Sequence, residues 1–376
     1  MFFREIIGQD ILKNRLVQVI EENRLSHAWL LFGAEGTGAL PMALALARYI
    51  LCTNRGERDS CGICAGCSKI SKYIHPDLHF VFPVNKTRSV DKDGVIADDF
   101  IAEWRAFLLK NPYGRLTQWF DHIEIENKQG IINTEESKRL AGKLSLKPFE
   151  SEYKVAIIWY PEKMNEQASN KLLKLLEEPP PNTVFLLVSE NPDQILSTVK
   201  SRCIPVKVPR ISKNALTEAL MKIHQLDKAT ADNIERLASG NYLKALDLIS
   251  EEEDISYNFN KFRELMRNCF SRNIPGIMKQ SEDLSVLTRE KQKSFLEYGL
   301  RVLRESLALH FNTGDIVYIS DEEQDFTPKF APFVNGNNIV PLTEELNKAI
   351  QDVERNGNSR IIMLDLALTI STLIKN

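Results

Sequence analysis

The sequence predicts a doubly wound α/β domain followed by two helical segments, and two observations support this. Short apolar strands alternate with amphipathic helical patterns up to about residue 208, which is typical of a parallel sheet covered by helices on both faces. After Pro209 only helical patterns follow. Because 376 residues exceed what one core usually organises, we expect several domains. They are an α/β base over residues 1–208, a small helical domain over 209–255 and a longer helical domain over 256–376.

Composition and charge limit the classes of function. Hydrophobic residues make up 43% of the chain and charged residues 26%, as in an ordinary soluble globular protein. The formal net charge of −3 argues against a protein whose whole surface binds nucleic acid. The opening stretch MFFREIIGQD turns polar at once, and no apolar run approaches the ~20 residues that cross a bilayer. We therefore expect a soluble, cytoplasmic protein without a membrane partner.

The first elements are an amphipathic helix and a buried strand. The stretch DILKNRLVQVIEENRL has helical periodicity. One face of this helix is predicted to hold Ile11, Leu12, Leu16, Val17 and Ile20. The stretch AWLLF at 28–32 is continuously apolar, as expected of a strand buried on both faces of a parallel sheet.

The loop after this strand has the glycines of a phosphate-binding loop but not its reactive side chains. Gly33, Gly36 and Gly38 fit the pattern G-x-x-x-x-G-K-[ST], whereas Ala39 replaces the lysine and Leu40 replaces the magnesium-binding hydroxyl residue. We expect the glycines to serve only the sharp turn from strand to helix. The alternative is residual nucleotide binding, without hydrolysis, by backbone N–H groups at the helix N-terminus.

A cysteine cluster follows the next helix, ALPMALALARYIL. Its spacing over 52–67 is C-x8-C-x2-C-x2-C. The cluster comprises Cys52, Cys61, Cys64 and Cys67. Cytosolic thiols stay reduced, and four thiolates in a closed tetrahedron form a structural zinc site with no open position for catalysis. A coincidental set of buried or redox-active thiols is the alternative. Because four sulfurs complete the coordination sphere, His75 is expected to be a loop or capping residue.

A second strand, DLHFVFP, precedes a segment of about 84–130 that we interpret as an insertion. It begins with the polar, turn-rich stretch NKTRSVDKDGVIADDF. A helix, IAEWRAFLLK, then ends near Asn111. Trp104, Phe107 and Leu108 are expected to form the packed face of this helix, and a partner-binding patch is the alternative. The sequence assigns no role to the insertion.

The strand KVAIIWY lacks the acidic residues of a P-loop ATPase. Such enzymes need carboxylates at the end of a second strand to hold magnesium and orient the attacking water. Trp159 and Tyr160 stand there instead, and neither side chain binds a hard cation. Glu162 follows in a poor register, and Glu35 would bring negative charge close to a bound phosphate. The sequence therefore predicts that this chain does not hydrolyse ATP.

The end of the predicted base carries one intact charged motif. It follows the helix TEESKRLAGKLSL, with Thr134 as the expected N-cap, and the helix EQASNKLLKLLEE, which prolines close. The motif SRC then places Arg202 at the edge of the domain. An arginine supplied to a neighbouring site can accelerate phosphoryl transfer by ~10³–10⁵. An ordinary surface salt bridge is the alternative. Cys203 and Cys269 occupy apolar positions and are expected to be core residues.

Taken together, these features resemble the AAA+ clamp-loader subunits of bacterial DNA polymerase III. The similarity is carried in family order by IIGQDILKNRLVQVIEENRLSHAWLLFG, the four-cysteine insert, HPDLHFVFP, NKLLKLLEEPPPNTVFLL and SRC. It spans Ile6 to Cys203 and continues beyond about residue 210 mainly as an arrangement of helices. It implies an AAA+ base, a lid over 209–255 and a collar over 256–376, through which five subunits form a ring.

The resemblance also implies roles for individual residues. The four clustered cysteines would hold zinc, and Arg202 would reach in trans into the ATP site of a neighbouring motor subunit. In this family a stator subunit does not turn over ATP. The residues that replace the ATPase residues, Ala39 and Leu40 in the loop and Trp159 and Tyr160 at the strand end, distinguish such a stator from the motor subunits. Leu243 stands where an active lid would offer a nucleotide-sensing arginine.

The preferred function is therefore a non-hydrolysing stator subunit that assists ATP-dependent loading of a sliding clamp on primed DNA. The implied partners are the motor (gamma/tau) subunits and the delta subunit of a five-membered ring. The sliding clamp and primer-template DNA would be reached through the complex. Zinc is the expected cofactor, and ATP is not expected to bind. The alternatives are an active AAA+ motor subunit of the same loader and a zinc-dependent DNA-binding protein.

Overall fold

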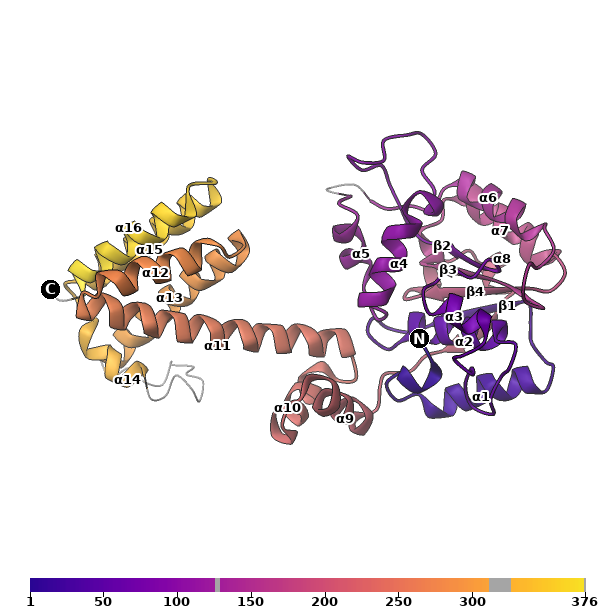
Figure 1. Ribbon diagram of the computed structural model, residues 1–376, viewed down its shortest axis with the longest axis horizontal. Coiled ribbons are helices and arrows are strands. Elements are labelled where there is room, and N and C mark those ends of the chain that lie inside the picture. Colours follow the sequence, from indigo (N-terminus) through magenta and orange to yellow (C-terminus); the bar gives the residue numbers. More distant parts are fainter. Residues whose placement is uncertain (126–128, 311–325, 375–376) are drawn as a thin grey trace. The chain divides into compact units, whose positions relative to one another are not determined.

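The computed structural model describes residues 1–125, 129–310 and 326–374. The chain forms two compact units, Met1–Leu248 and Ile249–Asn376 (Figure 1). Unit 1 contains the sheet and the helices around it, and unit 2 is helical. In the described part of the chain, no helix is both long enough and apolar enough to cross a membrane.

Unit 1 is built on a five-stranded parallel sheet in the order β2-β3-β4-β1-β5. Strand β1 pairs with β4, the central strand, on one side and with β5 on the other, so that Leu30 lies opposite Leu187 and Pro205. The strands are β1 (Ala28–Phe32), β2 (Leu78–Val81), β3 (Lys154–Trp159), β4 (Thr183–Ser189) and β5 (Ile204–Lys207). The predicted α/β base with a parallel sheet is confirmed.

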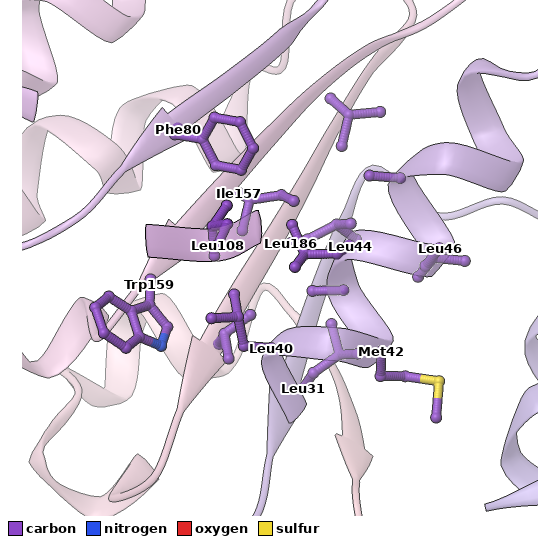
Figure 2. Packing of buried hydrophobic residues seen from close by; sticks show 14 of the residues in the cluster. Leu31, Leu40, Met42, Leu44, Leu46, Phe80, Leu108, Ile157, Trp159 and Leu186 are labelled. Carbon is purple, nitrogen blue, oxygen red and sulfur yellow. The ribbon is translucent and has the colours of Figure 1, made fainter. Parts of the chain in front are cut away.

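Successive side chains of a strand point to opposite faces of the sheet. The strands here are apolar on both faces, and helices cover both. On one face, Leu31, Ile157 and Leu186 pack against α2 and the insertion (Figure 2). On the other face, the neighbouring residues Leu30 and Leu187 pack against α6 and α7. The helices of the base are α1 (Asp10–Glu21), α2 (Ala39–Leu51), α3 (Ala65–Ile70), α4 (Ile101–Lys110), α5 (Leu116–His122), α6 (Thr134–Leu144), α7 (Glu166–Glu177) and α8 (Ser197–Lys200).

Two local predictions in the base were wrong. Ile11 is 90% exposed, although Leu16 lies in the core as expected. At 3.6 residues per turn, Ile11 lies roughly 140° around the helix from Leu16, so that the two do not share a face. The N-cap of α6 is Asn133, whose side chain accepts the N–H groups of Glu135 and Glu136, and Thr134 is the first helical residue.

The inserted segment packs into the core of unit 1 through aromatic side chains. Trp104, Phe107 and Leu108 are all buried, which confirms the predicted inner face of α4. The Trp104 ring stacks on Phe82 with centroids 4.3 Å apart and lies 4.9 Å from the ring of Trp159. The insertion thereby reaches the end of β3, next to the phosphate-binding loop.

The helices after β5 lead from unit 1 into unit 2. In unit 1, α9 (Lys213–His224) and α10 (Lys228–Ala238) pack together. The next helix, α11 (Tyr242–Ser271), continues without a break through residues 255 and 256, where the sequence placed a domain boundary. The division into base, lid and collar stays a prediction.

Unit 2 has its own hydrophobic core. Phe262, Leu296, Leu346 and Leu366 are among its buried residues. Helix α12 packs against α16, and α13 packs against α15. The remaining helices of unit 2 are α12 (Ile274–Ser285), α13 (Arg289–His310), α14 (Thr327–Phe330), α15 (Ile339–Glu354) and α16 (Ser359–Leu373).

Candidate functional site

The four clustered cysteines converge on one point. Cys52 ends α2, Cys64 is the N-cap of α3, and Cys67 lies inside α3. All four Sγ atoms lie within 4.8 Å of one another, and the Cys52–Cys61 and Cys61–Cys67 separations are 3.6 and 3.9 Å. Four thiolates at the Zn–S bond length of 2.3 Å would stand roughly 3.8 Å apart, so the cluster fits a tetrahedral zinc ion.

Backbone N–H groups support the sulfurs of this cluster. The N–H of Cys61 donates to Cys52 Sγ at 3.4 Å, that of Cys64 to Cys61 Sγ at 3.4 Å, and that of Cys67 to Cys64 Sγ at 3.3 Å. Such N–H···S bonds favour thiolates, which are the metal-binding form. The loop of 52–67 is thus folded as a ligand set, which accords with a structural rather than a catalytic metal.

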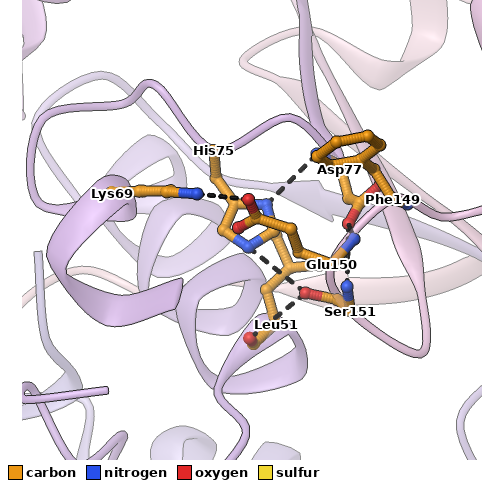
Figure 3. A network of polar contacts seen from close by, with 7 residues as sticks. All are labelled: Leu51, Lys69, His75, Asp77, Phe149, Glu150 and Ser151. Atoms are coloured by element: carbon orange, nitrogen blue, oxygen red, sulfur yellow. Dashed lines mark hydrogen bonds and ion pairs between the residues drawn. The ribbon is translucent and has the colours of Figure 1, made fainter. Parts of the chain in front are cut away.

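His75 lies outside this ligand set, in a separate polar network (Figure 3). Its Nδ1 accepts the N–H of Asp77 at 3.1 Å, and its Nε2 lies 3.2 Å from the Ser151 hydroxyl. The Asp77 carboxylate accepts the N–H groups of Phe149, Glu150 and Ser151. Burial lowers the pKa of His75. Nδ1 therefore holds the turn before β2 and Nε2 the loop before β3, as expected of a loop residue.

The glycines of the phosphate-binding loop keep its backbone shape. Gly36 and Gly38 have φ values of +73° and +96°, in the region that only glycine enters without strain. A Cβ atom on Gly33 would lie 2.4 Å from the carbonyl oxygen of Val208. Ala39 and Leu40 are buried at the start of α2, and Leu40 packs in the same cluster as Trp159 (Figure 2). The loop thus retains the turn, and the side chains of a phosphate site are replaced by core packing.

Aromatic side chains fill the space in front of this loop. Trp159 and Tyr160 at the end of β3 are buried, with ring centroids 4.8 Å apart. Tyr113 from the insertion lies against Gly38, where an added Cβ atom would approach its ring to 3.1 Å. The remaining cavity, lined by the loop and these three rings, measures about 30 Å³.

Tyr113 is anchored on two further sides. Its hydroxyl accepts the N–H of Ile7 at 2.9 Å, and its ring meets Tyr242 edge-on with centroids 5.0 Å apart. Burial raises the pKa of Tyr113, so the hydroxyl stays neutral. Tyr113 therefore joins the N-terminal segment, the loop and the first turn of α11.

The start of α11 contacts the loop directly. The Tyr242 N–H donates to the Gly36 carbonyl at 3.1 Å, and the Asn241 side chain occupies the space where a Cβ atom of Gly36 would stand. Leu243, which the sequence placed at the nucleotide-sensing position, is buried beside the same glycine.

Charged residues beside the loop form an ion-pair bridge. Arg115 lies 3.1 Å from the Glu35 carboxylate of the loop and 2.9 Å from the Asp247 carboxylate of α11. Glu35, Glu162 and Glu190 line an adjoining cavity of about 240 Å³. Burial raises the pKa of Glu190 to about 7. Arg115 and Lys163 line the same cavity, and Glu35 is already paired with Arg115, so the charges beside the loop largely balance within the chain.

Glu162 has a structural role in the turn that follows β4. Its Oε1 atom accepts the N–H groups of Glu190 and Asn191, each at 3.2 Å. These bonds fix the turn after β4. Burial raises the pKa of Glu162.

Arg202 lies between α8 and β5, away from the loop cavity. Its guanidinium forms an ion pair of 2.6 Å with Glu177, the last residue of α7, and donates to the Thr198 carbonyl at 2.9 Å. The side chain is 36% exposed. The residues that line the loop cavity come from other segments, so the structure does not bring Arg202 together with Gly33, Gly36 and Gly38.

Comparison with known protein families shows the family to which this chain belongs. Residues 8–212, more than half of the chain, match the family described as "DNA polymerase III, delta subunit". This chain belongs to that family. The sequence-based resemblance to clamp-loader subunits of DNA polymerase III is thereby confirmed.

The chain is also similar in sequence to individual subunits of DNA polymerase III. The chain is 28% identical over 311 residues to DNA polymerase III subunit delta' of Bacillus subtilis (strain 168), covering 81% of the chain and 79% of the relative. It is 27% identical over 308 residues to subunit delta' of Escherichia coli (strain K12), covering 81% and 77%. With subunit tau of Bacillus subtilis it shares 24% identity over 269 residues, covering 70% of the chain and 40% of tau.

Solved structures give a weaker likeness. A DNA polymerase III gamma-subunit-related protein from Thermotoga maritima has a TM-score of 0.34 and 14% identity, covering 96% of this chain and 99% of that protein. A RuvB mutant from the same organism has a TM-score of 0.37 and 13% identity, covering 82% and 79%.

Proposed function

We propose that this protein is a non-hydrolysing stator subunit of a DNA polymerase III clamp loader. The observation that carries the proposal is the filled space at the phosphate-binding loop, where about 30 Å³ remains. Small-molecule and cofactor pockets usually measure several hundred Å³. A nucleotide therefore has no room beside Gly36 and Gly38, and the loop serves as part of the scaffold.

The chemistry of hydrolysis is missing as well as the space. Ala39 and Leu40 offer neither the cation nor the hydroxyl that phosphates and magnesium require, and Trp159 and Tyr160 replace the carboxylates. These features argue against the alternative of an active motor subunit. They agree with the similarity to delta' subunits along most of the chain.

The insertion takes the place of a ligand between the loop and the predicted lid. Tyr113 and Arg115 supply a hydrogen bond, an aromatic contact and two ion pairs that link the N-terminal segment, the loop and α11. The arrangement of base and lid is then set by side chains of the chain itself and not by ATP. A subunit of constant shape suits a stator against which motor subunits move.

Arg202 is proposed to act on the ATP of a neighbouring motor subunit. In this chain its guanidinium is held by Glu177, and the pair is partly exposed. Exposed ion pairs contribute about 0–1 kcal/mol, so exchanging Glu177 for a phosphate costs little. Arginine suits this role because its charge is permanent and its fork matches phosphate oxygens.

Zinc is proposed as a structural cofactor, held by Cys52, Cys61, Cys64 and Cys67. The ion would fix the end of α2 to the start of α3 and supply no catalytic chemistry, because four thiolates leave no open position. The proposed partners are the gamma/tau and delta subunits of a five-membered ring. The sliding clamp and primer-template DNA would be met through that complex.

The role of Arg202 is tested in a reconstituted loader. With Arg202→Ala, DNA-stimulated ATP turnover of the complex should fall, by ~10³–10⁵ at the one site that Arg202 serves. Lys200→Ala is the matched control, because Lys200 is a nearby cation already paired with Asp193 at 3.5 Å. It should leave turnover unchanged. Normal turnover in the correctly assembled Arg202→Ala complex would refute the trans role.

A further inference from the structure

Unit 2 contains a cavity that the proposed function does not use. It measures about 410 Å³ and lies between α11, the segment 326–333 and the end of α16. Met266 and Ile374 contribute buried apolar side chains to its wall. This volume falls in the range of pockets that hold a small molecule or a few side chains.

Phenylalanine rings form most of the apolar wall. Phe326 stacks on Phe330 with centroids 5.2 Å apart, and Phe270 meets Phe333 edge-on at 5.0 Å. Phe270 and Phe333 are 44% and 39% exposed. Partly exposed aromatic side chains in the wall of a cavity are typical of a binding site for an apolar group.

Every charged side chain in the lining is a cation. These are Arg263, Arg267 and Lys329. Arg263 donates to the Asn260 side chain and lies over the Phe259 ring. Within the described residues, no carboxylate forms an ion pair with any of the three.

Other cations of unit 2 do form ion pairs with carboxylates. Lys261 lies 3.5 Å from Asp283, and Lys348 lies 3.2 Å from Glu345 and 3.5 Å from Asp365. The cavity therefore concentrates positive charge around an apolar hollow, on a chain whose net charge is −3.

A single strand of nucleic acid is a poor match for this shape. Strand-binding proteins use an open groove that follows successive phosphates and offers free ring faces for stacking. Here the Phe326 and Phe330 rings already stack on each other, and Phe330 is buried. The shape and charge of the cavity suit one apolar group with anions around it.

We propose that this cavity binds an acidic peptide segment of a partner protein. A phenylalanine or a large aliphatic side chain of the peptide enters between the rings, and flanking carboxylates contact Arg263, Arg267 and Lys329. Arginine forks bind carboxylates in a bidentate manner, which gives such a site its selectivity. The site is independent of the phosphate-binding loop and of Arg202.

The test measures fluorescence anisotropy with the full chain and fluorescein-labelled decapeptides. The probes carry one Phe, Leu or Ile flanked on both sides by Asp and Glu. The comparison peptides have Ser at the apolar position or Lys at the acidic ones, and an oligonucleotide of twelve thymidines is included. We expect saturable binding of the acidic apolar peptides only, weakened at least tenfold by either comparison change.

Variants test whether the peptides bind in the cavity. Arg267→Glu and Phe270→Ser should each weaken binding at least tenfold, whereas Lys279→Glu, an exposed cation of α12 outside the lining, should not. Circular dichroism melts check that each variant is folded. Because Phe270→Ser removes a ring that packs on Phe333, Arg267→Glu keeps the test valid if the former unfolds.

Four results would overturn the proposal. They are failure of every acidic apolar peptide to bind, binding that survives Arg267→Glu, stronger binding of the oligonucleotide, and self-association of the chain that Arg267→Glu abolishes. The chain also carries acidic residues at 321–323 and 325, outside the described residues. If peptides bind only after these are neutralised, the occupant is the chain itself and not a partner.

Discussion

Gly36 and Gly38 preserve the left-handed turn of the phosphate-binding loop, while the residues around them differ from the motif's phosphate- and magnesium-binding side chains. Ala39 and Leu40 turn the start of α2 into core, and Tyr113 closes the space in front of Gly38. The first change is visible in the sequence because the motif fixes the register of each position. The second is not, because Tyr113 lies far along the chain and reaches the loop only through the folded insertion.

The cysteine cluster leads to a prediction about metal content. Because all four sulfurs lie within 4.8 Å of one another, near enough to share one tetrahedral ion, the purified native protein should contain one zinc ion per chain. Cys64→Ser should lose the ion and lower the melting temperature. Cys203→Ser, a buried cysteine outside the cluster, should keep it. Elemental analysis by mass spectrometry measures both, and a folded, metal-free wild-type protein would contradict the assignment.

Glu136 leads to a prediction about pH. Burial raises the pKa of this side chain to about 7, although the Ala97 N–H donates to it. In the unfolded chain its pKa is about 4.3, so between those values the native state binds more protons and the free energy of unfolding falls as pH rises. Between pH 4.5 and 8 this fall amounts to roughly 3 kcal/mol at most, and Glu136→Gln should abolish it.

Urea unfolding of wild type and variant at several pH values measures this difference. Glu135→Gln is the matched control, because Glu135 is exposed and Lys138 holds its pKa below the usual value. It should leave the slope in that window unchanged. Parallel pH profiles for wild type and Glu136→Gln would contradict the assignment of the slope to Glu136.

At the scale of elements, the insertion connects parts of unit 1 that are distant in sequence. Its helix α4 packs Trp104 against Phe82 and Trp159, and the following loop delivers Tyr113 and Arg115 to the phosphate-binding loop. The apolar face of α4 could be predicted from its periodicity. The role of the loop after it depends on tertiary contacts that no local pattern encodes.

Arg115 carries a prediction about local opening. Arg115→Ala removes the ion pairs to Glu35 and Asp247, which are partly exposed and contribute about 1 kcal/mol in total. Amide hydrogen exchange at Tyr242 and its neighbours should accelerate roughly fivefold, as a loss of about 1 kcal/mol implies. Lys110→Ala, an exposed position at the end of α4, should not change it. Unaltered exchange in Arg115→Ala would show that the bridge does not hold α11 to the loop.

Helix boundaries show where sequence patterns lose information. The sequence suggests a domain boundary between residues 255 and 256, and the structure has the single helix α11 across it. The acidic run around that point contains neither glycine nor proline. Polar residues are compatible with an exposed helix, whereas glycine or proline would have ended it.

At the scale of the whole molecule, the two units have separate hydrophobic cores. The alternation of strands and helices predicted the sheet of unit 1, because parallel strands buried on both faces are continuously apolar. The helical content of unit 2 was also predictable from periodicity. Its cavity was not, because residues of α11, α14 and α16 meet there only after folding.

The central claim is that this chain has a filled nucleotide position and acts on ATP only through a neighbour. Equilibrium dialysis of the purified protein with radiolabelled ATP and magnesium, followed by a phosphate-release assay, tests it most directly. We expect no saturable binding at millimolar ATP and no phosphate release above a protein-free control. Binding of one ATP per chain, with repeated release of phosphate, would contradict it.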